Sequence, residues 1–376
     1  MILGLFTDLE PIGGVQRAGR HVAAVMAEFA CSSGRQYRLL SLNDSRKLHC
    51  MSVAGREFVF DGCERNKVRF ISPAIQAGWK KAEVVVAAYP TLGPVAPFVR
   101  GLGPRAKSVV IAHGVEVWTP LPPLPRLALR MADLVLTPTR DTAKHVAAHQ
   151  GVADGRIRVL PWAIDPDFLT LISHRSALPA DFPKGRVILT VGRWSGERYK
   201  GVDTLIAALP SLVAEWSDLH LVVAGGGSDN SWLEQTADEH GVRRHVHFLR
   251  GLSYEAIAAC YSACEIFAMP SRGEGFGLVY LEAMACSKPV IGGSHGGAPE
   301  VIEDGKTGFL VRHGDVDQVV ASLRTLLADP ALGQAMGAKG RERVDREFSF
   351  DSFAKSLRQI LSDLCDSGDG GGHVRH

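Results

Sequence analysis

Short apolar runs alternate with helix-like segments along most of this chain. Runs of about four to eight apolar residues bounded by Gly, Pro or polar residues are typical of buried strands, and the segments between them have helical periodicity. Because parallel strands need a long crossover, usually a helix, the alternation predicts βαβ units and an α/β fold with mainly parallel sheets. The expected strands are Ile2–Asp8, Tyr37–Leu42, Lys67–Ile71, Glu83–Ala88, Ser108–Ala112, Leu134–Thr137, Ile157–Leu160, Val187–Val191, Leu219–Ala224, Val246–Leu249, Glu265–Met269, Pro289–Ile291 and Phe309–Val311.

The length of the chain indicates two domains. With 376 residues, each half is large enough to bury a core of its own. We expect two Rossmann-like domains, residues 1–172 and 173–348, with the boundary in Ser173–Gly185, where Pro and Gly cluster without periodicity. Apolar residues at helical spacing in Phe350–Leu364 predict a terminal helix over 349–365 and leave 366–376 as a glycine-rich, disordered tail.

Composition narrows the class of protein further. Hydrophobic residues make up 46% and charged residues 22%, as in ordinary globular proteins, and no apolar run approaches the roughly 18 residues of a membrane span. We expect no signal peptide, because a basic segment and a cleavage site are missing at the N-terminus. The seven cysteines include no Cys-x-x-Cys pair, and Cys260, Cys264 and Cys286 lie in apolar segments typical of reduced thiols. These features favour a cytoplasmic location.

Charge is distributed unequally between the two halves. Residues 1–170 carry a net charge of +7 and the remainder −5, which together give the +2 of the whole chain. A basic first half suits an anionic partner such as a lipid phosphate or a membrane surface. Scattered solvated charge explains the same excess, and both interpretations stay open.

The segment Ser271-Arg-Gly-Glu274-Gly-Phe-Gly-Leu-Val-Tyr-Leu-Glu282 carries the clearest functional pattern. It follows a buried strand and runs through a glycine-rich loop into a helix. The amides of Gly275, Phe276, Gly277 and Leu278 are therefore predicted to form an anion site at the start of that helix. Glu274 and Glu282 are about two helical turns apart, too far to share a proton. They suit two different polar groups of one elongated ligand, with phosphate between them.

This pair of glutamates, with Gly296-Gly297-Ala-Pro-Glu300 and Gly305-Lys-Thr-Gly308 after it, resembles the retaining GT-B glycosyltransferases of the glycosyltransferase group 1 family. The resemblance implies two Rossmann-like domains whose parallel sheets face each other across a cleft. It implies that Glu274 contacts hydroxyls of a donor sugar and that Glu282 binds the ribose of its nucleotide. It also implies front-face displacement, with no metal ion and no other cofactor.

Two cations follow the strand Val187–Val191. Arg193 and Lys200 come after its carboxyl end, where ligands of open parallel sheets bind. Fixed cations stabilise the charge that a departing nucleoside diphosphate gains. The pair resembles the diphosphate-binding Arg and Lys of the family, and Arg198 is a competing cation ranked second.

Other candidates lie at the ends of further strands. Gly13 and Gly14 follow the first strand, and glycines at such a turn let the backbone approach a phosphate. His113 follows the strand Ser108–Ala112, and the resemblance places it near the donor sugar or the acceptor. The resemblance also places Arg250 near the base or phosphates, although a surface arginine fits equally well. The histidines form no convincing metal-ligand set.

The segment Trp118–Met131 mixes aliphatic residues, prolines and arginines, and Trp79-Lys80-Lys81 lies upstream. Either segment suits a membrane interface or a lipid-linked acceptor. A core helix preceded by a proline loop is the favoured alternative for Trp118–Met131.

The expected function is that of a retaining hexosyltransferase that uses a nucleotide-sugar. GDP-mannose is the favoured donor and a UDP-hexose the alternative, and the acceptor is a glycolipid or polysaccharide precursor by analogy with the family. Peripheral contact with the inner face of a membrane is part of this expectation, whereas a nucleic-acid partner is not. A GT-B epimerase and a non-catalytic nucleotide-sugar-binding protein are the remaining alternatives.

Overall fold

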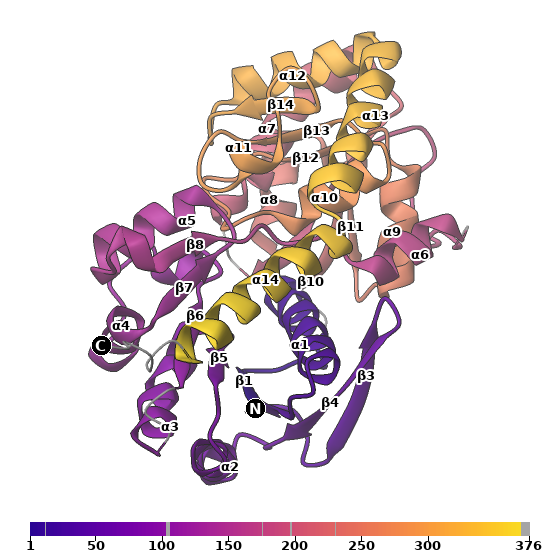
Figure 1. The fold of residues 1–376 in the computed structure, drawn as a ribbon. Helices are drawn as coiled ribbons and strands as arrows, with labels where there is room; N and C mark the ends of the chain where they lie inside the picture. The colour runs from indigo at the N-terminus through magenta and orange to yellow at the C-terminus, as the bar shows by residue number, and fades with distance from the viewer. Residues whose placement is uncertain (12, 103–105, 175, 196–197, 230, 370–376) are drawn as a thin grey trace. The chain divides into compact units, whose positions relative to one another are not determined.

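The computed structural model describes residues 1–376 except 12, 103–105, 175, 196–197, 230 and 370–376 (Figure 1). The chain forms two compact units. The first unit consists of Met1–Ala163 and Phe350–His376, and the second of Ile164–Ser349. None of the helices in the described parts of the chain is both long and apolar enough to span a bilayer.

The described residues of the first unit form one sheet with the strand order β3-β4-β2-β1-β5-β6-β7-β8. All neighbouring strands are parallel except β3 and β4, which form an antiparallel hairpin at one edge. Alternate residues of the central strands, among them Leu3, Leu5, Val85 and Ala87, belong to one buried core cluster. The strands are β1 (Ile2–Phe6), β2 (Tyr37–Ser41), β3 (Leu48–Val53), β4 (Arg56–Gly62), β5 (Val84–Ala87), β6 (Lys107–Ile111), β7 (Leu134–Thr137) and β8 (Ile157–Val159).

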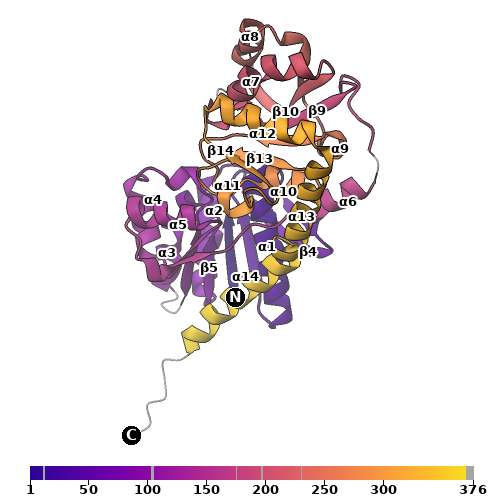
Figure 2. The same cartoon turned by 90° about the horizontal axis from the view of Figure 1, so that it is seen from above.

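Helices from both ends of the chain complete the first unit. The terminal helix α14 lies beside α1 in both views (Figures 1 and 2). Phe350 packs edge-on against His21 with ring centroids 5.0 Å apart, and Arg358 donates to Glu28 at 3.0 Å. The helices of this unit are α1 (Gly14–Ser32), α2 (Lys67–Trp79), α3 (Ala96–Leu102), α4 (Pro123–Met131), α5 (Arg140–His145) and α14 (Phe350–Asp369).

The second unit has a parallel sheet with the order β11-β10-β9-β12-β13-β14. Its strands are β9 (Arg186–Ser195), β10 (Leu219–Asp229), β11 (Val246–Arg250), β12 (Ile266–Met269), β13 (Val290–Gly293) and β14 (Gly308–Val311). Its helices are α6 (Pro166–Ser173), α7 (Val202–Glu215), α8 (Ser231–Glu239), α9 (Tyr254–Ala263), α10 (Leu278–Ala285), α11 (Ala298–Val301), α12 (Val316–Ala328) and α13 (Pro330–Glu347). The step in strand order between β9 and β12 is where parallel sheets of this kind bind ligands.

One prediction about the first unit is wrong, and one feature of it was not predicted. Lys67–Ile71 is not a strand but the first turn and a half of α2, because the Asn66 side chain accepts hydrogen bonds from the amides of Val68 and Arg69. The hairpin of β3 and β4 was not predicted. Ala54 and Gly55 form its turn, both with positive φ, as a two-residue hairpin loop requires.

The units also divide earlier in the chain than the expected boundary at Ser173–Gly185. They change between Ala163 and Ile164, because α6 packs into the second unit. Phe168 of α6 lies 5.6 Å from the ring of Tyr261 and 5.8 Å from that of Tyr254, both on α9. At the other end, α14 continues to Asp369, so the first residues of the expected tail are helical. Residues 370–376 lie outside the described residues.

Candidate active site

Lys200 lies at the carboxyl end of β9, in the middle of the second unit's sheet. A Cβ built on Gly192 of β9 would stand 2.9 Å from the Lys200 Nζ atom, so a side chain at this position would displace the ammonium group from where it lies. The ammonium group also lies 5.3 Å from the ring centroid of Trp194, whose Nε1 donates to the Ala224 carbonyl at 3.1 Å. The buried Trp194 ring, held by this hydrogen bond, therefore provides a fixed surface on which the Lys200 ammonium packs.

The two other cations of this segment point to different surroundings. Arg193, at the end of β9, has an exposed side chain. The Arg198 guanidinium is exposed and lies 5.1 Å above the ring of Trp232 on α8. Lys200 and Arg198 are the two candidates for the second diphosphate-binding cation. Lys200 lies against the end of β9, whereas Arg198 packs on Trp232 of α8. The ranking of Lys200 over Arg198 as the diphosphate-binding cation stays a prediction.

Glu274 lies in the loop between β12 and α10, and its backbone is held in place. Its carbonyl oxygen accepts from the amide of Gly297 at 2.6 Å. Gly296, with φ +70°, leaves no room for a side chain, because a Cβ would be 2.7 Å from that same carbonyl oxygen. The sequence Gly296-Gly297 after β13 therefore has a structural task, which is to let this loop pass close to Glu274.

Glu274 is half-buried as a residue, but its Oε1 atom is fully buried and has no hydrogen-bond partner among the described residues. Burial raises the pKa of the Glu274 carboxyl group, and the nearby Lys200 ammonium opposes that rise. Buried polar atoms without a partner are rare, and in a crevice they are typical of ligand-binding positions. Glu274 and Lys200 together thus offer a hydrogen-bonding atom and a cation to one ligand.

The helix α10 begins at Leu278, with Gly277 as its N-cap residue at φ +92°. The first amide of the helix is therefore that of Leu278, three residues after Gly275, where the predicted anion site begins. Gly275 and Phe276 belong to the preceding loop, and the Phe276 ring is buried 5.7 Å from that of Phe348. Phe276 thus anchors the loop, while Leu278 opens the helix whose dipole favours an anion.

Glu282 is buried in the second turn of α10, where two tyrosines of α9 surround it. Tyr261 donates its hydroxyl hydrogen to Oε2 at 2.8 Å, and the Tyr254 hydroxyl lies 3.5 Å from Oε1. The sequence alone did not point to these tyrosines. Their spacing of seven residues, which places them on one face of a helix, was the available signal. A ribose at Glu282 would compete with these hydroxyls.

Arg250 ends β11, the edge strand of the sheet. Its exposed guanidinium donates to Glu234 of α8 at 2.5 Å. Because β10 separates β11 from β9, the sheet does not bring Arg250 to the strand ends that carry Lys200 and Glu274.

His113 and the two glycines belong to the first unit. His113 follows β6 and is buried; its Nε2 donates to the Ala88 carbonyl at 2.8 Å, and its backbone N–H donates to Oε1 of Glu116 at 2.5 Å. Burial lowers the pKa of His113, with Glu116 and the Ala88 carbonyl opposing, so the ring is neutral near pH 7. Gly13 is the N-cap of α1 and Gly14 its first residue, after the end of β1. Strands β1, β5 and β6 are neighbours, so these groups share one edge of the sheet.

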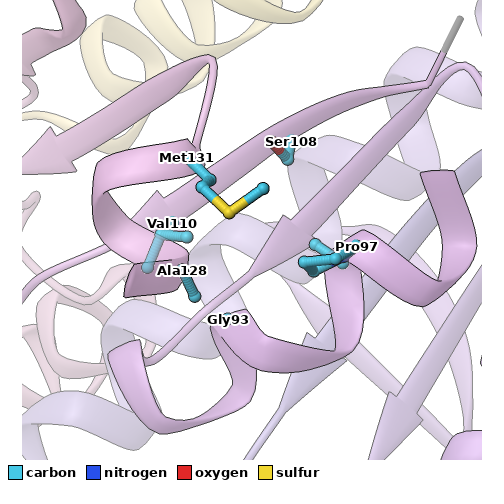
Figure 3. Close-up of a pocket in the computed structure, with 7 residues that line it drawn as sticks. Gly93, Pro97, Ser108, Val110, Ala128 and Met131 are labelled. Carbon is cyan, nitrogen blue, oxygen red and sulfur yellow. The ribbon is translucent and has the colours of Figure 1, made fainter. Parts of the chain in front are cut away.

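A cavity of about 210 Å³ lies elsewhere in the first unit (Figure 3). It has an apolar wall, and the hydroxyl of its one polar side chain, Ser108, donates to Asp133 at 3.0 Å. The cavity thus offers no chemistry. It is lined by Gly93, Ala96, Pro97, Ser108, Val110, Ala128 and Met131. The described residues contain no group of three His, Cys, Asp or Glu side chains placed to hold a metal ion, and metal independence stays a prediction.

Two α/β units, each built on a largely parallel sheet, are the architecture of the GT-B fold. Residues 179–343 match the family model described as glycosyl transferases group 1, and residues 13–168 match that of glycosyltransferase family 4. The chain belongs to the glycosyl transferases group 1 family.

Curated relatives and solved structures agree with this assignment. The chain is 36% identical over 288 residues to the GDP-mannose-dependent alpha-(1-6)-phosphatidylinositol monomannoside mannosyltransferase of Mycolicibacterium smegmatis, covering 72% of this chain and 74% of that protein. It is 30% identical over 249 residues to a glycogen synthase of Mycobacterium tuberculosis, covering 66% and 56%. The sucrose-phosphate synthase of Thermosynechococcus elongatus shares the fold, with a TM-score of 0.76, 22% identity, and 97% and 99% coverage.

Proposed function

We propose that this glycosyltransferase moves mannose from GDP-mannose to a glycolipid or polysaccharide-precursor acceptor, with retention at the anomeric carbon and without a metal ion. One observation carries the proposal. The Lys200 ammonium rests against Gly192 at the carboxyl end of β9, close to the buried, unpartnered Oε1 of Glu274. A cation and a spare carboxylate oxygen side by side suit the diphosphate and the sugar of one nucleotide-sugar.

In this mechanism the bond between the anomeric carbon and the diphosphate oxygen breaks while the acceptor oxygen bonds to the same face of that carbon. The acceptor proton passes to an oxygen of the leaving diphosphate. Arg193, Lys200 and the first amides of α10 stabilise the negative charge that the diphosphate gains. Glu274 accepts hydrogen bonds from sugar hydroxyls through its free oxygen.

The remaining candidates bind the ends of the substrates. Glu282 holds the ribose after its tyrosine contacts yield, and Arg250 lies near the base. From the first unit, the neutral His113 ring keeps its Nδ1 lone pair free to accept a hydroxyl hydrogen, because Nε2 already donates to Ala88. The Gly13-Gly14 turn lets the backbone approach a donor phosphate or the acceptor.

The choice of mannose rests on relatives. The name of the 36%-identical protein from M. smegmatis specifies GDP-mannose as its donor and a phosphatidylinositol monomannoside as its acceptor. The glycogen synthase of M. tuberculosis shares fewer residues and less of its length. A UDP-hexose-dependent transferase is the second candidate, and an epimerase or a non-catalytic nucleotide-sugar-binding protein follows.

Thermal unfolding with GDP, UDP and ADP tests the donor. A ligand of the folded state at 100 times its dissociation constant stabilises it by about 2.7 kcal/mol. We expect GDP to raise the melting temperature most, and a preference for UDP would overturn the mannose assignment. Incubation with GDP-mannose and phosphatidylinositol monomannoside then separates the classes. A transferase gives a new α-linked mannose by NMR, an epimerase changes the donor without acceptor, and a binding protein leaves both unchanged.

Peripheral membrane contact belongs to the same proposal, for a cytoplasmic enzyme that meets its lipid-linked acceptor at the inner face of a membrane. Leu124, Leu127 and Met131 of α4 are exposed and fall on one face of that helix. The exposed Arg130 flanks them, and Met131 also borders the apolar cavity (Figure 3). Apolar side chains flanked by cations suit an anionic lipid surface.

A further inference from the structure

Tyr89 occupies the carboxyl end of β5, between the ends of β1 and β6. The turn with Gly13 and Gly14 follows β1, and His113 follows β6. Neighbouring strands of a sheet are about 4.8 Å apart, so Tyr89 lies in the row of strand ends that also carries His113. Its side chain is half-buried, whereas the adjacent residues of β5 are fully buried.

A stack of aromatic rings holds Tyr89 in place. The Tyr89 ring stacks on His113 with centroids 5.7 Å apart and an interplanar angle of 27°. His113 in turn lies 5.3 Å from Trp162, and Trp162 lies 6.0 Å from Phe353 of α14. His113 is fixed by two hydrogen bonds of its own. The position of the Tyr89 ring is therefore fixed by its packing on His113, and a preformed binding surface requires such a fixed position.

The phenolic hydroxyl of Tyr89 has no hydrogen-bond partner among the described residues, and it is not one of their buried unpartnered atoms, so it is open to solvent. The hydroxyls of Tyr261 and Tyr280 differ in this respect, since they donate to Glu282 and to the Met269 carbonyl, both at 2.8 Å. Burial, helped by Glu116, raises the pKa of Tyr89 to about 12, and the phenol therefore keeps its proton at neutral pH.

We propose that Tyr89 binds the acceptor, with its ring as a floor for a hydroxylated ring such as a pyranose or a cyclitol and its O–H bonded to one of that ring's oxygens. This assignment rests on the proposed function, in which His113 and the Gly13-Gly14 turn of the first unit bind the ends of the substrates. The negative face of a phenol attracts the partly positive C–H edge of a sugar ring, and the phenolic O–H supplies a directed polar contact. Tyrosine is suited to this task because it combines both properties in one rigid side chain.

Two variants of Tyr89 and one matched control test the proposal. Tyr89→Phe removes only the hydroxyl, and Tyr89→Leu also removes the aromatic face. Tyr37→Phe is the control, because its hydroxyl lies in the same unit but accepts from the Val59 amide at 3.3 Å. With GDP-mannose and phosphatidylinositol monomannoside, we expect the acceptor KM to rise roughly threefold to tenfold in Tyr89→Phe and further in Tyr89→Leu. The donor KM and the control should stay at wild-type values.

Saturation-transfer NMR reads the same site without turnover. With GDP-saturated protein and methyl α-D-mannopyranoside, we expect ring-proton signals in the wild type that weaken in Tyr89→Phe and disappear in Tyr89→Leu. Wild-type acceptor KM and signals in both variants, or an absence of signals in the wild type, would overturn the proposal. If GDP fails to stabilise the protein and no mannose is transferred while the signals still depend on Tyr89, the proposed function fails and the acceptor-binding residue stands.

Discussion

The ammonium nitrogen of Lys200 lies so close to Gly192 that a Cβ built on this glycine would stand 2.9 Å from the nitrogen. Because Gly192 has no side chain, the space beside this end of β9 is open to the Lys200 ammonium. Gly201, which follows Lys200, has φ +73° and passes close to the carbonyl of Pro270, the residue after β12. These two glycines bring Lys200 to the same strand ends as Glu274.

Lys200→Ala should lower the rate of mannosyl transfer by roughly 10²–10³-fold, because it removes the fixed positive charge that we propose stabilises the leaving diphosphate. Arg198→Ala is the matched control, since the Arg198 guanidinium packs on Trp232 and is exposed. It should change the rate less than threefold. The initial rates of both variants with saturating GDP-mannose decide between them. An equal loss in the two variants would show that the segment as a whole, and not Lys200, supplies the charge.

Glu274→Gln should separate stability from activity. The variant keeps the shape of the side chain and removes a charge that burial disfavours. Burial raises the pKa of Glu274 in the folded state above its pKa in the unfolded chain. The free energy of unfolding therefore falls as the pH rises above the unfolded pKa, because the carboxyl group ionises more readily in the unfolded chain, and it recovers at acid pH. Glutamine should therefore stabilise the unliganded protein at pH 7 by roughly 1 kcal/mol, and the gain should vanish below about pH 4. Its transfer rate should fall.

The melting temperatures of Glu274→Gln and of the wild type, measured between about pH 4 and pH 7, test this prediction. Glu300→Gln, on α11 of the same unit, is the control for the loss of one negative charge. A destabilised Glu274→Gln at neutral pH would mean that the carboxylate is satisfied in solution and is not reserved for a ligand.

The strands of the second unit were predictable because each contains a short apolar run bounded by glycine, proline or polar residues. The error at Lys67–Ile71 has a local cause. Its residues suit a strand, but the cap supplied by Asn66 outweighs that preference. The hairpin of β3 and β4 was missed because β3 buries His49 and exposes Leu48 and Cys50, so its apolar residues do not mark the buried face. In addition, alanine rarely occupies a positive-φ turn position.

Only part of the candidate site could be predicted from the sequence, because contacts between distant segments leave no local pattern. Lys200 and Glu274 follow strands that are adjacent in the sheet, and the position after a parallel strand is a feature of local sequence. The partners of Glu282 come from another helix, α9, and no local pattern links Tyr261 to it. The stack of Tyr89 on His113 likewise joins the ends of two strands, and neither residue signals the other in the sequence.

A cluster of histidines should make the protein sensitive to acid. On adjacent strands, His247 Nε2 lies 3.1 Å from His220 Nδ1. Burial is the main cause that lowers the pKa of both groups, and His245 and Arg243 add to it, while Asp181 and Asp218 oppose it. With folded pKa values below those of the unfolded chain, unfolding binds protons, so the free energy of unfolding falls as pH drops below about 7.

His247→Gln should flatten this dependence by up to one proton between about pH 7 and pH 5. Denaturant unfolding at several pH values gives the slope, and His174→Gln, at an exposed position of the same unit, is the control. A slope in His247→Gln that equals that of the wild type would show that the pair titrates normally.

Replacing Leu124 and Leu127 by glutamate should detach the protein from membranes without loss of fold. Both leucines are exposed on α4, at 69% and 52%, so the two changes remove no core contact. The loss of apolar area and the added negative charge should lower binding to phosphatidylglycerol vesicles by roughly tenfold or more in co-sedimentation. Leu48→Glu, at an exposed position of β3, is the matched control and should bind as the wild type does. Transfer to a water-soluble mannoside should be unchanged in all variants, because α4 carries none of the proposed catalytic groups. Equal binding by the double variant and the wild type would assign the exposed face of α4 to something other than a lipid surface.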